Sequence, residues 1–182
     1  DIVVAAASLA VVALPMLLIA CAIRLTSAGP VIFRQKRYGL DGRPFEIWKF
    51  RTMVTIEDGE ARFEQARRND SRVTRVGSLL RRTSLDELPN LFNVVRGEMA
   101  IVGPRPTISE QVEEYTPEQR RRLEVKPGLT GWAQVNGRAS LPWEERIELD
   151  VWYVDNRSPR LDLRIIGRTV GLLVAGRGLY EA

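Results

Sequence analysis

The sequence contains no histidine and only one cysteine, Cys21. The lack of histidine excludes Ser-His and Cys-His catalytic pairs and every metal site that depends on histidine ligands. A single cysteine excludes an internal disulfide and a cysteine-rich metal site. Any chemistry must therefore come from Asp, Glu, Lys, Arg, Ser, Thr or Tyr side chains.

Charge is also missing from one part of the chain, because residues 2–23 contain no Asp, Glu, Lys or Arg and all 27 basic residues lie beyond them. The whole chain is 27% charged and 45% hydrophobic, which excludes a disordered or fibrous protein. Its 182 residues fit one domain with a short appendage. The basic body favours anionic partners, namely phosphates, nucleic acid or membrane headgroups.

The uncharged run over residues 2–23 is long enough to cross a bilayer core, because a helix of this length measures about 30 Å. A signal peptide would begin with basic residues, whereas Asp1 precedes this run and Arg24 follows it. Pro15 lies near the middle and should kink or break the helix. Two short half-helices suit a re-entrant hairpin, so we expect residues 1–25 to enter the membrane and return; a spanning helix is the alternative.

The residues that follow the uncharged run indicate on which side of the membrane the rest of the chain lies. A basic cluster follows directly, which predicts that the remainder of the chain, residues 26–182, lies on the cytoplasmic side; it consists of Arg24, Arg34, Lys36 and Arg37. The chain does not begin with Met, so we expect it to be a piece of a longer protein with segments upstream.

The body reads as a mixed α+β fold that is mostly helical. A β-hairpin is predicted where residues 31–35 and 44–50 flank a turn-rich segment over 38–43. Helices are predicted over 57–69, 74–83, 85–96, 108–115, 117–125, 141–155 and 160–175. The last of these carries a wide apolar stripe with basic residues opposite it, a pattern that fits either a membrane interface or packing on the core.

Two adjacent carboxylates, Asp86 and Glu87, are the main candidates for chemistry. They fall in the first turn of the predicted helix 85–96, where Ser84 and Glu87 have the spacing of a capping box, so a structural role is one interpretation. The other is functional, because paired carboxylates beside Arg81 and Arg82 can bind Mg²⁺ together with phosphate. A carboxylate can also attack phosphorus.

Two loops offer cations to a phosphate. Gly103-Pro-Arg-Pro106 presents one guanidinium on a segment that its prolines make rigid, and an ordinary surface loop is the alternative. Residues 126–138, Lys-Pro-Gly-Leu-Thr-Gly-Trp-Ala-Gln-Val-Asn-Gly-Arg, form a glycine-rich segment whose amides could approach phosphate oxygens. Turn formation alone would also explain those glycines.

These motifs, together with residues 83–94, resemble those of the bacterial sugar transferases in the same order. The resemblance covers nearly the whole chain, from residues 29–35 to residues 149–156 and beyond. The family consists of monotopic polyprenyl-phosphate phosphoglycosyl transferases that initiate exopolysaccharide, O-antigen and glycoconjugate assembly. It implies transfer of a sugar 1-phosphate from a UDP-sugar to undecaprenyl phosphate, with Mg²⁺ as cofactor and UMP as product.

The resemblance also implies a location and a fold. The location is the bacterial inner membrane, with the catalytic domain on the cytoplasmic face. The fold combines a re-entrant helix, a small β-hairpin and interfacial amphipathic helices. One departure is that Leu14-Pro15 stands where many relatives have Ser-Pro. A serine hydroxyl can bond back to the preceding turn, so the bend here depends on Pro15 and the rest of the sequence.

Site residues follow from the motifs that match. Asp86 corresponds to a nucleophile that forms a covalent intermediate and Glu87 to its partner, and both are expected to hold Mg²⁺. Arg105, with Pro104 and Pro106 beside it, corresponds to an arginine near the uridine nucleotide. The other substrate-binding positions implied by the family are Lys49, Arg138 and Asp162.

Two further classes of function are weighed against the enzyme. A membrane-tethered nucleic-acid binder would suit the basic charge, but no recognition motif is present and the basic residues are interleaved with acids. A non-catalytic scaffold would not need the intact Asp86-Glu87 pair. The expected partners are therefore the donor, the lipid acceptor and membrane lipids, without nucleic acid, and self-association stays open.

Overall fold

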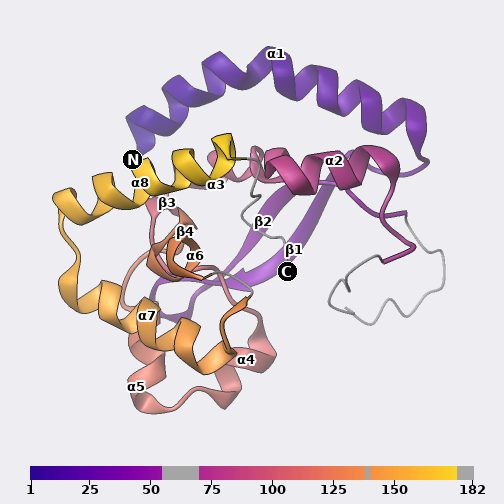
Figure 1. Ribbon diagram of the computed structural model, residues 1–182. Helices are drawn as coiled ribbons and strands as arrows, with labels where there is room; N and C mark the ends of the chain where they lie inside the picture. The colour runs from indigo at the N-terminus through magenta and orange to yellow at the C-terminus, as the bar shows by residue number, and fades with distance from the viewer. Residues whose placement is uncertain (55–69, 138–139, 176–182) are drawn as a thin grey trace.

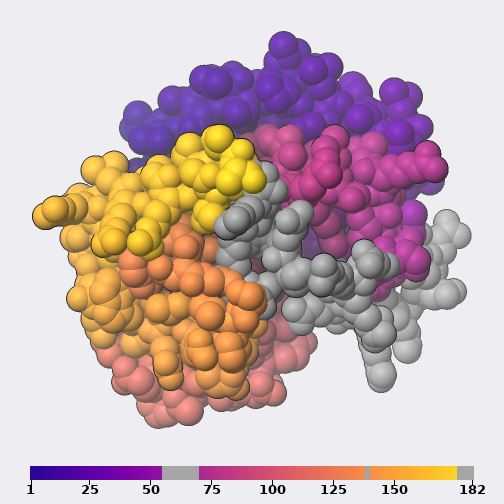
Figure 2. All heavy atoms as spheres, in the orientation of Figure 1, coloured from indigo at the N-terminus to yellow at the C-terminus, as the bar shows by residue number. Residues whose placement is uncertain are grey.

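A computed structural model describes residues 1–54, 70–137 and 140–175 and shows an α+β fold that is mostly helical (Figure 1). The predicted fold class is confirmed. A long apolar helix, α1, lies along one edge of the molecule, and its surface forms that whole edge in Figure 2. The predicted helix over 57–69 and the predicted site residue Arg138 lie outside the described residues.

Helix α1 covers Ile2–Thr26 as one continuous helix with Pro15 inside it. Of the two expected effects of this proline, a kink or a break, the structure shows the first: the ribbon is bowed, with its concave side toward the body (Figure 1). The helix is long and apolar enough to cross a membrane. Its buried residues are Ala5 near the start and Ile23 near the end, so most of its apolar surface is exposed, which indicates membrane association.

Both ends of α1 pack on the same body. Ala5 belongs to a hydrophobic cluster with Leu91 and Val94 of helix α3, which covers Asn90–Val95. Ile23 belongs to a second cluster with Phe50 and with Leu80 of helix α2, which covers Arg75–Thr83. The two helices on which α1 packs, α2 and α3, are therefore neighbours in sequence, with only residues 84–89 between them.

The predicted hairpin is present. Strand β1 (Ile32–Tyr38) pairs in antiparallel fashion with β2 (Pro44–Phe50), and a 3₁₀ turn, η1 (Leu40–Gly42), joins them. In this register Phe33 lies opposite Lys49 and Arg37 lies opposite Phe45. Because side chains alternate along a strand, Arg37 and Lys49 lie on the same face of the hairpin.

The predicted helix over 85–96 is wrong at its start. Ser84 adopts a left-handed conformation, with φ of 57°, and ends α2. A short 3₁₀ turn, η2 (Leu85–Glu87), follows it, and α3 begins only after Pro89. Pro89 has no amide to donate in a longer helix, and the Ser84 side chain makes no capping hydrogen bond, so the predicted capping box does not form.

A second small sheet was not predicted. Strands β3 (Ala100–Val102) and β4 (Gly128–Thr130) pair in parallel. The chain between them forms α4 (Ser109–Glu114), α5 (Pro117–Arg120) and a 3₁₀ turn, η3 (Arg121–Leu123), in place of one helix over 117–125. The start of α5 has a capping box, from Thr116 to Gln119, and the predicted helix over 117–125 is correct at this end.

Three helices complete the fold: α6 (Trp132–Asn136), α7 (Trp143–Asn156) and α8 (Pro159–Val174). In α8, Ile165 is fully buried beside Val102, so one side of this helix packs on the core. Val170 and Val174 on the same helix are exposed. The structure therefore shows core packing and also leaves apolar residues of α8 at the surface.

Candidate active site

The turn η2 places the two predicted catalytic carboxylates side by side but in different surroundings. The Asp86 side chain is buried, with 8% of the residue exposed. The Glu87 carboxylate forms ion pairs with Lys49 Nζ and, at 3.4 Å, with Arg105 Nη2. Three predicted site residues are therefore in direct contact: Lys49 from strand β2, Glu87 from the turn η2, and Arg105 from the loop after residue 102.

A third cation, Arg37, borders the same place. Arg37, Lys49, Glu87, Arg105 and Pro106 line one cavity of about 10 Å³, closed by Ile47, Asn90, Met99 and Gly128. The hairpin register explains the arrangement, because it puts Arg37 on the face that carries Lys49. A space of this size holds about one water molecule. The cluster is therefore packed closely around Glu87, whose carboxylate pairs with Lys49 and Arg105.

Burial and charge shift the protonation of this cluster. Burial first, and the neighbouring Glu87 second, raise the pKa of the Asp86 carboxyl, and Lys49, Arg81 and Arg105 oppose the shift; together they leave this pKa at about 6. Burial likewise lowers the pKa of Lys49, against the pull of Glu87. Perturbed groups of opposite charge at one place are typical of functional sites.

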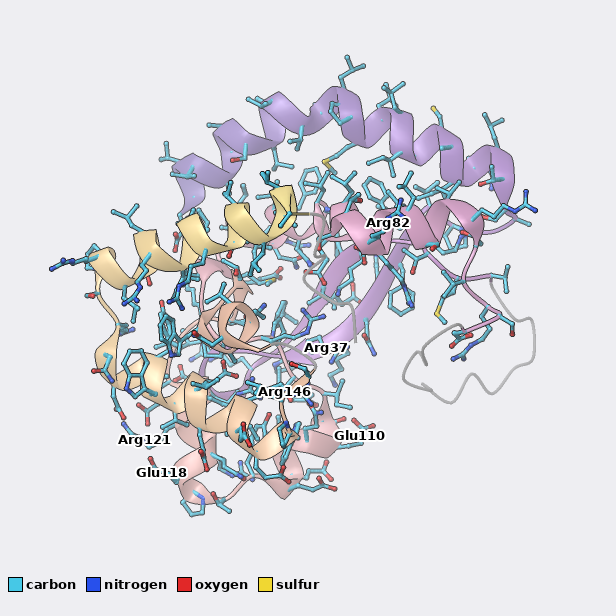
Figure 3. The ribbon with its side chains drawn as sticks, viewed as in Figure 1. Arg37, Arg82, Glu110, Glu118, Arg121 and Arg146 are labelled. Atoms are coloured by element: carbon cyan, nitrogen blue, oxygen red, sulfur yellow. The ribbon has the colours of Figure 1, made fainter. Side chains whose placement is uncertain are left out.

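Arg37 has a lowered pKa of about 10, first because of burial and second because of Arg105. In Figure 3 its side chain lies in the middle of the molecule, whereas Arg82 projects from α2. Arg81, the other member of the predicted pair beside the carboxylates, donates from Nε to Thr52 Oγ1 at 2.9 Å.

Buried asparagines fix the hairpin against α3. The Trp48 amide donates to Asn90 Oδ1 and Asn93 Oδ1, both at 3.2 Å. Asn93 Nδ2 donates in turn to the Glu46 carbonyl at 2.6 Å. These bonds hold β2 at the start of α3, and so they place Lys49 beside Glu87.

The Gly103-Pro-Arg-Pro106 segment is tied to the small sheet rather than being an ordinary surface loop. The Gly103 amide donates to the Thr130 carbonyl and the Gly128 amide donates to the Pro104 carbonyl, both at 2.9 Å. The approach is so close that a Cβ on Gly128 would lie 2.1 Å from the Gly103 nitrogen. Gly128 therefore serves backbone packing, and its amide is already used.

Asp162 lies elsewhere. It accepts a hydrogen bond from the Tyr153 hydroxyl at 2.8 Å and lines a separate hollow of about 560 Å³ with Lys126 and Arg157. The structure thus brings together Lys49, Asp86, Glu87, Arg105 and Pro106, whereas Asp162 borders a different cavity.

Sequence reasoning missed several residues that shape the site. Arg37 was assigned only to a basic cluster after the leader, although the hairpin register would have placed it with Lys49. Asn90 and Asn93 are polar residues within an otherwise apolar stretch, and this is a signal that they form buried hydrogen bonds.

The carboxylate oxygens at the site can be compared with the ligands that Mg²⁺ prefers. In the described part of the chain no three Asp, Glu, Cys or His residues gather around one point. Mg²⁺ is usually bound through one or two carboxylates together with substrate phosphates. Asp86 Oδ1 is buried and has no hydrogen-bond partner among the described residues, so its capacity as an oxygen ligand is unused. The pair Asp86 and Glu87 therefore fits a Mg²⁺ ion that is shared with a phosphate.

Comparison with known proteins identifies the family of the chain. The family described as "Bacterial sugar transferase" matches residues 1–176. The chain belongs to the bacterial sugar transferase family. A Bacillus subtilis protein named "Uncharacterized sugar transferase EpsL" is 46% identical to this family member over 159 residues, covering 87% of the chain and 77% of the relative.

Two other relatives of this sugar transferase have names that state a reaction. Proteins from Escherichia coli and Caulobacter vibrioides are each named "UDP-glucose:undecaprenyl-phosphate glucose-1-phosphate transferase". The first is 47% identical over 178 residues, covering 93% of the chain but 38% of the relative. The second is 48% identical over 187 residues, covering 98% of the chain and 70% of the relative. The chain therefore corresponds to little more than a third of the Escherichia coli protein.

Proposed function

We propose that this protein transfers a sugar 1-phosphate from a UDP-sugar to undecaprenyl phosphate and releases UMP. The observation that carries the proposal is the buried Asp86 carboxyl next to Glu87, in a place where the cations Lys49 and Arg105 pair with Glu87 and also act on the charge of Asp86. A nucleophile next to phosphate-binding groups is what phosphoryl transfer requires. The names of the relatives from Escherichia coli and Caulobacter vibrioides support the same reaction.

Donor binding would begin with the cations. The diphosphate of a UDP-sugar carries negative charge, and Arg105, Lys49 and Arg37 present guanidinium and ammonium groups that bind phosphate oxygens strongly. Glu87 forms ion pairs with Lys49 and Arg105. A donor phosphate would therefore compete with Glu87 for these cations, and Glu87 would turn from them when the donor binds.

Transfer would then proceed in two displacements. An Asp86 carboxylate oxygen attacks the β-phosphorus of the donor, and the bond from that phosphorus to the UMP oxygen breaks. The sugar phosphate is now esterified to Asp86 as an acyl phosphate. A phosphate oxygen of undecaprenyl phosphate attacks the same phosphorus, forms the lipid diphosphate and frees the Asp86 carboxylate.

We include Mg²⁺ as the cofactor in this proposal. Asp86, through the oxygen that lacks a hydrogen-bond partner, and Glu87 would hold the ion together with the donor diphosphate. When bound, Mg²⁺ supplies neutralisation of the charge that develops on the leaving phosphate. Asp86 and Glu87 would be the protein's own contribution to its coordination.

The exposed apolar helix supports a place for this reaction at a membrane surface. A water-soluble donor and a lipid acceptor can meet only there, and α1 offers an apolar surface of the right length. We assign the site to the cytoplasmic face of the bacterial inner membrane, in keeping with the basic residues that follow α1.

The experiment that tests the function uses the protein in lipid nanodiscs with Mg²⁺, undecaprenyl phosphate and either UDP-glucose or UDP-galactose. We expect repeated turnover to need the acceptor. When acceptor is left out, about one UMP per enzyme should be released and a sugar-phosphate adduct on Asp86 should be found by mass spectrometry. The variant Asp86→Asn should lose both, whereas Asp155→Asn, which alters an exposed carboxylate on α7, should keep both.

Two outcomes would contradict the proposal, one for its route and one for the reaction itself. UMP release only in the presence of acceptor, without an adduct, would replace the two-step route with direct transfer in a ternary complex. No UMP release with any UDP-sugar would overturn the proposed reaction.

A further inference from the structure

Behind the cation cluster lies a second polar network that the reaction described above does not use. We infer that Arg122, with its ion-pair partner Asp150, is a positioning residue that sets the place of the Arg105 guanidinium. This inference rests on the proposed function, because it assigns Arg105 to the donor phosphates.

The Arg122–Asp150 pair is almost completely buried, with side-chain exposures of 7% and 3%. The pair connects the turn η3, which contains Arg122, to helix α7, which contains Asp150. A buried ion pair contributes little net stability by itself, because desolvation of both charges offsets their attraction. Stability alone therefore does not explain why this pair of charges is buried here.

One contact of Arg122 gives that explanation. While Asp150 holds the guanidinium from one side, Arg122 Nη2 donates to the backbone carbonyl of Arg105 at 3.0 Å. A hydrogen bond from a charged donor is stronger than one between neutral groups. The peptide that carries the phosphate-binding arginine is thus bonded directly to the buried pair.

A second path leads from the same guanidinium to the next residues of the loop. Arg122 Nη1 donates to the Tyr115 hydroxyl, which donates to Thr107 Oγ1 at 2.8 Å. Thr107 Oγ1 then donates to Gln111 Oε1 at 2.7 Å. Each hydroxyl accepts one bond and donates one, so the chain of bonds is complete and has one direction.

Thr107 also connects the network to the hairpin. The Tyr38 amide donates to the Thr107 carbonyl at 2.9 Å, directly after Arg37 in the sequence. Arg122 therefore fixes the loop at Arg105 itself and, through Tyr115, two residues later. Two of the three cations around Glu87, namely Arg37 and Arg105, are thus adjacent to backbone that this network holds.

The neighbouring residue supplies a matched control. Arg121 forms an ion pair with Asp155, and this pair also joins η3 to α7. It is exposed, and Figure 3 shows Arg121 and Glu118 at the outer end of the molecule, away from Arg37. If η3 and α7 needed only to be joined, the two pairs would be equivalent, but the contact to the Arg105 carbonyl belongs to Arg122.

The test is a double-mutant cycle between the network and Arg105. The network is removed by the combined change Arg122→Met and Asp150→Leu, because replacement of both charges leaves no buried unpaired ion and such swaps commonly preserve folding. Arg105→Ala is made alone and with this change. The affinity for UDP and the kinetics of UMP release are measured for all four proteins, with thermal unfolding as the check on folding.

We expect the network change to weaken UDP binding and raise KM about tenfold, with a smaller effect on kcat, because misplacement of a binding group acts on the donor. In the Arg105→Ala background the same change should have less than about a twofold effect. The control Arg121→Gln with Asp155→Asn should stay within about twofold of the parent protein. A single change, Tyr115→Phe, should give an intermediate loss, because it cuts only the path to Thr107.

Two results would overturn the inference: equal losses with and without Arg105, or equal losses from the Arg122 and Arg121 pairs. Either would show that the buried pair supports the fold in general. The proposed function fails separately, if the parent protein binds UDP but releases no UMP; the UDP-binding cycle then still decides the role of Arg122. A parent protein that does not bind UDP would overturn both.

Discussion

Asp86 combines two features that oppose folding. It is a buried carboxyl whose oxygen Oδ1 has no hydrogen-bond partner among the described residues, and it follows Ser84, which adopts a left-handed conformation. Such costs are common where a residue is kept for chemistry. The position therefore offers a test in which stability and activity change in opposite directions.

We expect Asp86→Asn to stabilise the protein at neutral pH while it abolishes turnover. The carboxyl pKa is about 6 in the folded state against 3.8 for an ordinary Asp, so the folded state favours the protonated form. Ionisation therefore lowers the free energy of unfolding as pH rises from 4 to 6, and the full penalty, up to about 3 kcal/mol, applies above that range. Denaturant unfolding in EDTA at pH 4 and pH 8 measures it.

The stabilisation by Asp86→Asn should be small at pH 4, because the carboxyl is protonated in the folded state and only partly ionised in the unfolded state. Asp155→Asn serves as the control, because that carboxylate is exposed and paired with Arg121. A lower free energy of unfolding for Asp86→Asn at pH 8 would contradict the prediction.

Glu87→Gln should separate donor binding from turnover. The change removes the carboxylate that occupies Lys49 and Arg105, so both cations become available to phosphate. We expect UDP to bind in EDTA at least as tightly as to the parent protein, while UMP release falls by about 100-fold or more. Calorimetric titration with UDP measures the affinity, and a clear loss of affinity would show that Glu87 aids donor binding.

At the scale of residues, the sequence predicted the members of the candidate site better than it predicted the residues that hold them in place. Asp86, Glu87 and Arg105 stand in recognisable motifs, and the structure brings them together with Lys49. Arg122 and Asp150 lie 28 positions apart in segments that read as ordinary helices. Their contact depends on how η3 meets α7, which is a tertiary feature that local patterns do not contain.

At the scale of elements, α1 carries the main prediction. Ala5 and Ile23, near its two ends, pack on helices of one body, and a helix that spanned a bilayer would place those ends about 30 Å apart on opposite sides. We therefore expect both ends to face the cytoplasm. Single cysteines at Asp1 and Thr26, introduced after Cys21→Ser, should both be unreactive toward an impermeant maleimide applied from the periplasm.

The same two positions should react after the inner membrane is opened. Labelling of the Asp1→Cys variant from the periplasm would show that α1 spans the membrane. The unmodified background with Cys21→Ser gives the baseline.

The elements that sequence patterns located correctly are those with a clear local signal. The hairpin has alternating apolar residues around a turn, and α5 begins with a capping box. Strands β3 and β4 have three residues each and pair across a long stretch of chain, so no local pattern marks them. The segment 85–96 has helical periodicity, but Pro89 and the left-handed Ser84 divide it.

At the scale of the whole molecule, the arrangement separates two kinds of surface. The bowed helix α1 forms one edge and exposes apolar side chains, whereas the exposed ion pairs of Arg121 lie at the far end of the body (Figure 3). The site around Glu87 is built between them, from β1, β2, η2 and the loop after β3. A soluble donor and a lipid acceptor could thus reach it from different sides.

The attachment of α1 on both sides of η2 has a consequence for the second half-reaction. Because α2 and α3 each carry one end of α1, the depth at which this helix settles in a bilayer fixes the height of Asp86 relative to the lipid phosphates. Leu14, which precedes Pro15 and is exposed, is a position at which that depth can be altered. A lysine there would be drawn toward the headgroups.

Leu14→Lys should therefore leave formation of the Asp86 adduct from UDP-sugar intact, because that step needs only the soluble donor. Transfer to undecaprenyl phosphate should fall by about tenfold or more, since each ångström of misplacement is costly in a displacement reaction. Leu25→Lys, at the exposed end of α1, is the matched control and should affect neither step. Equal loss of both steps in Leu14→Lys would show that α1 supports the fold rather than the vertical position of the nucleophile.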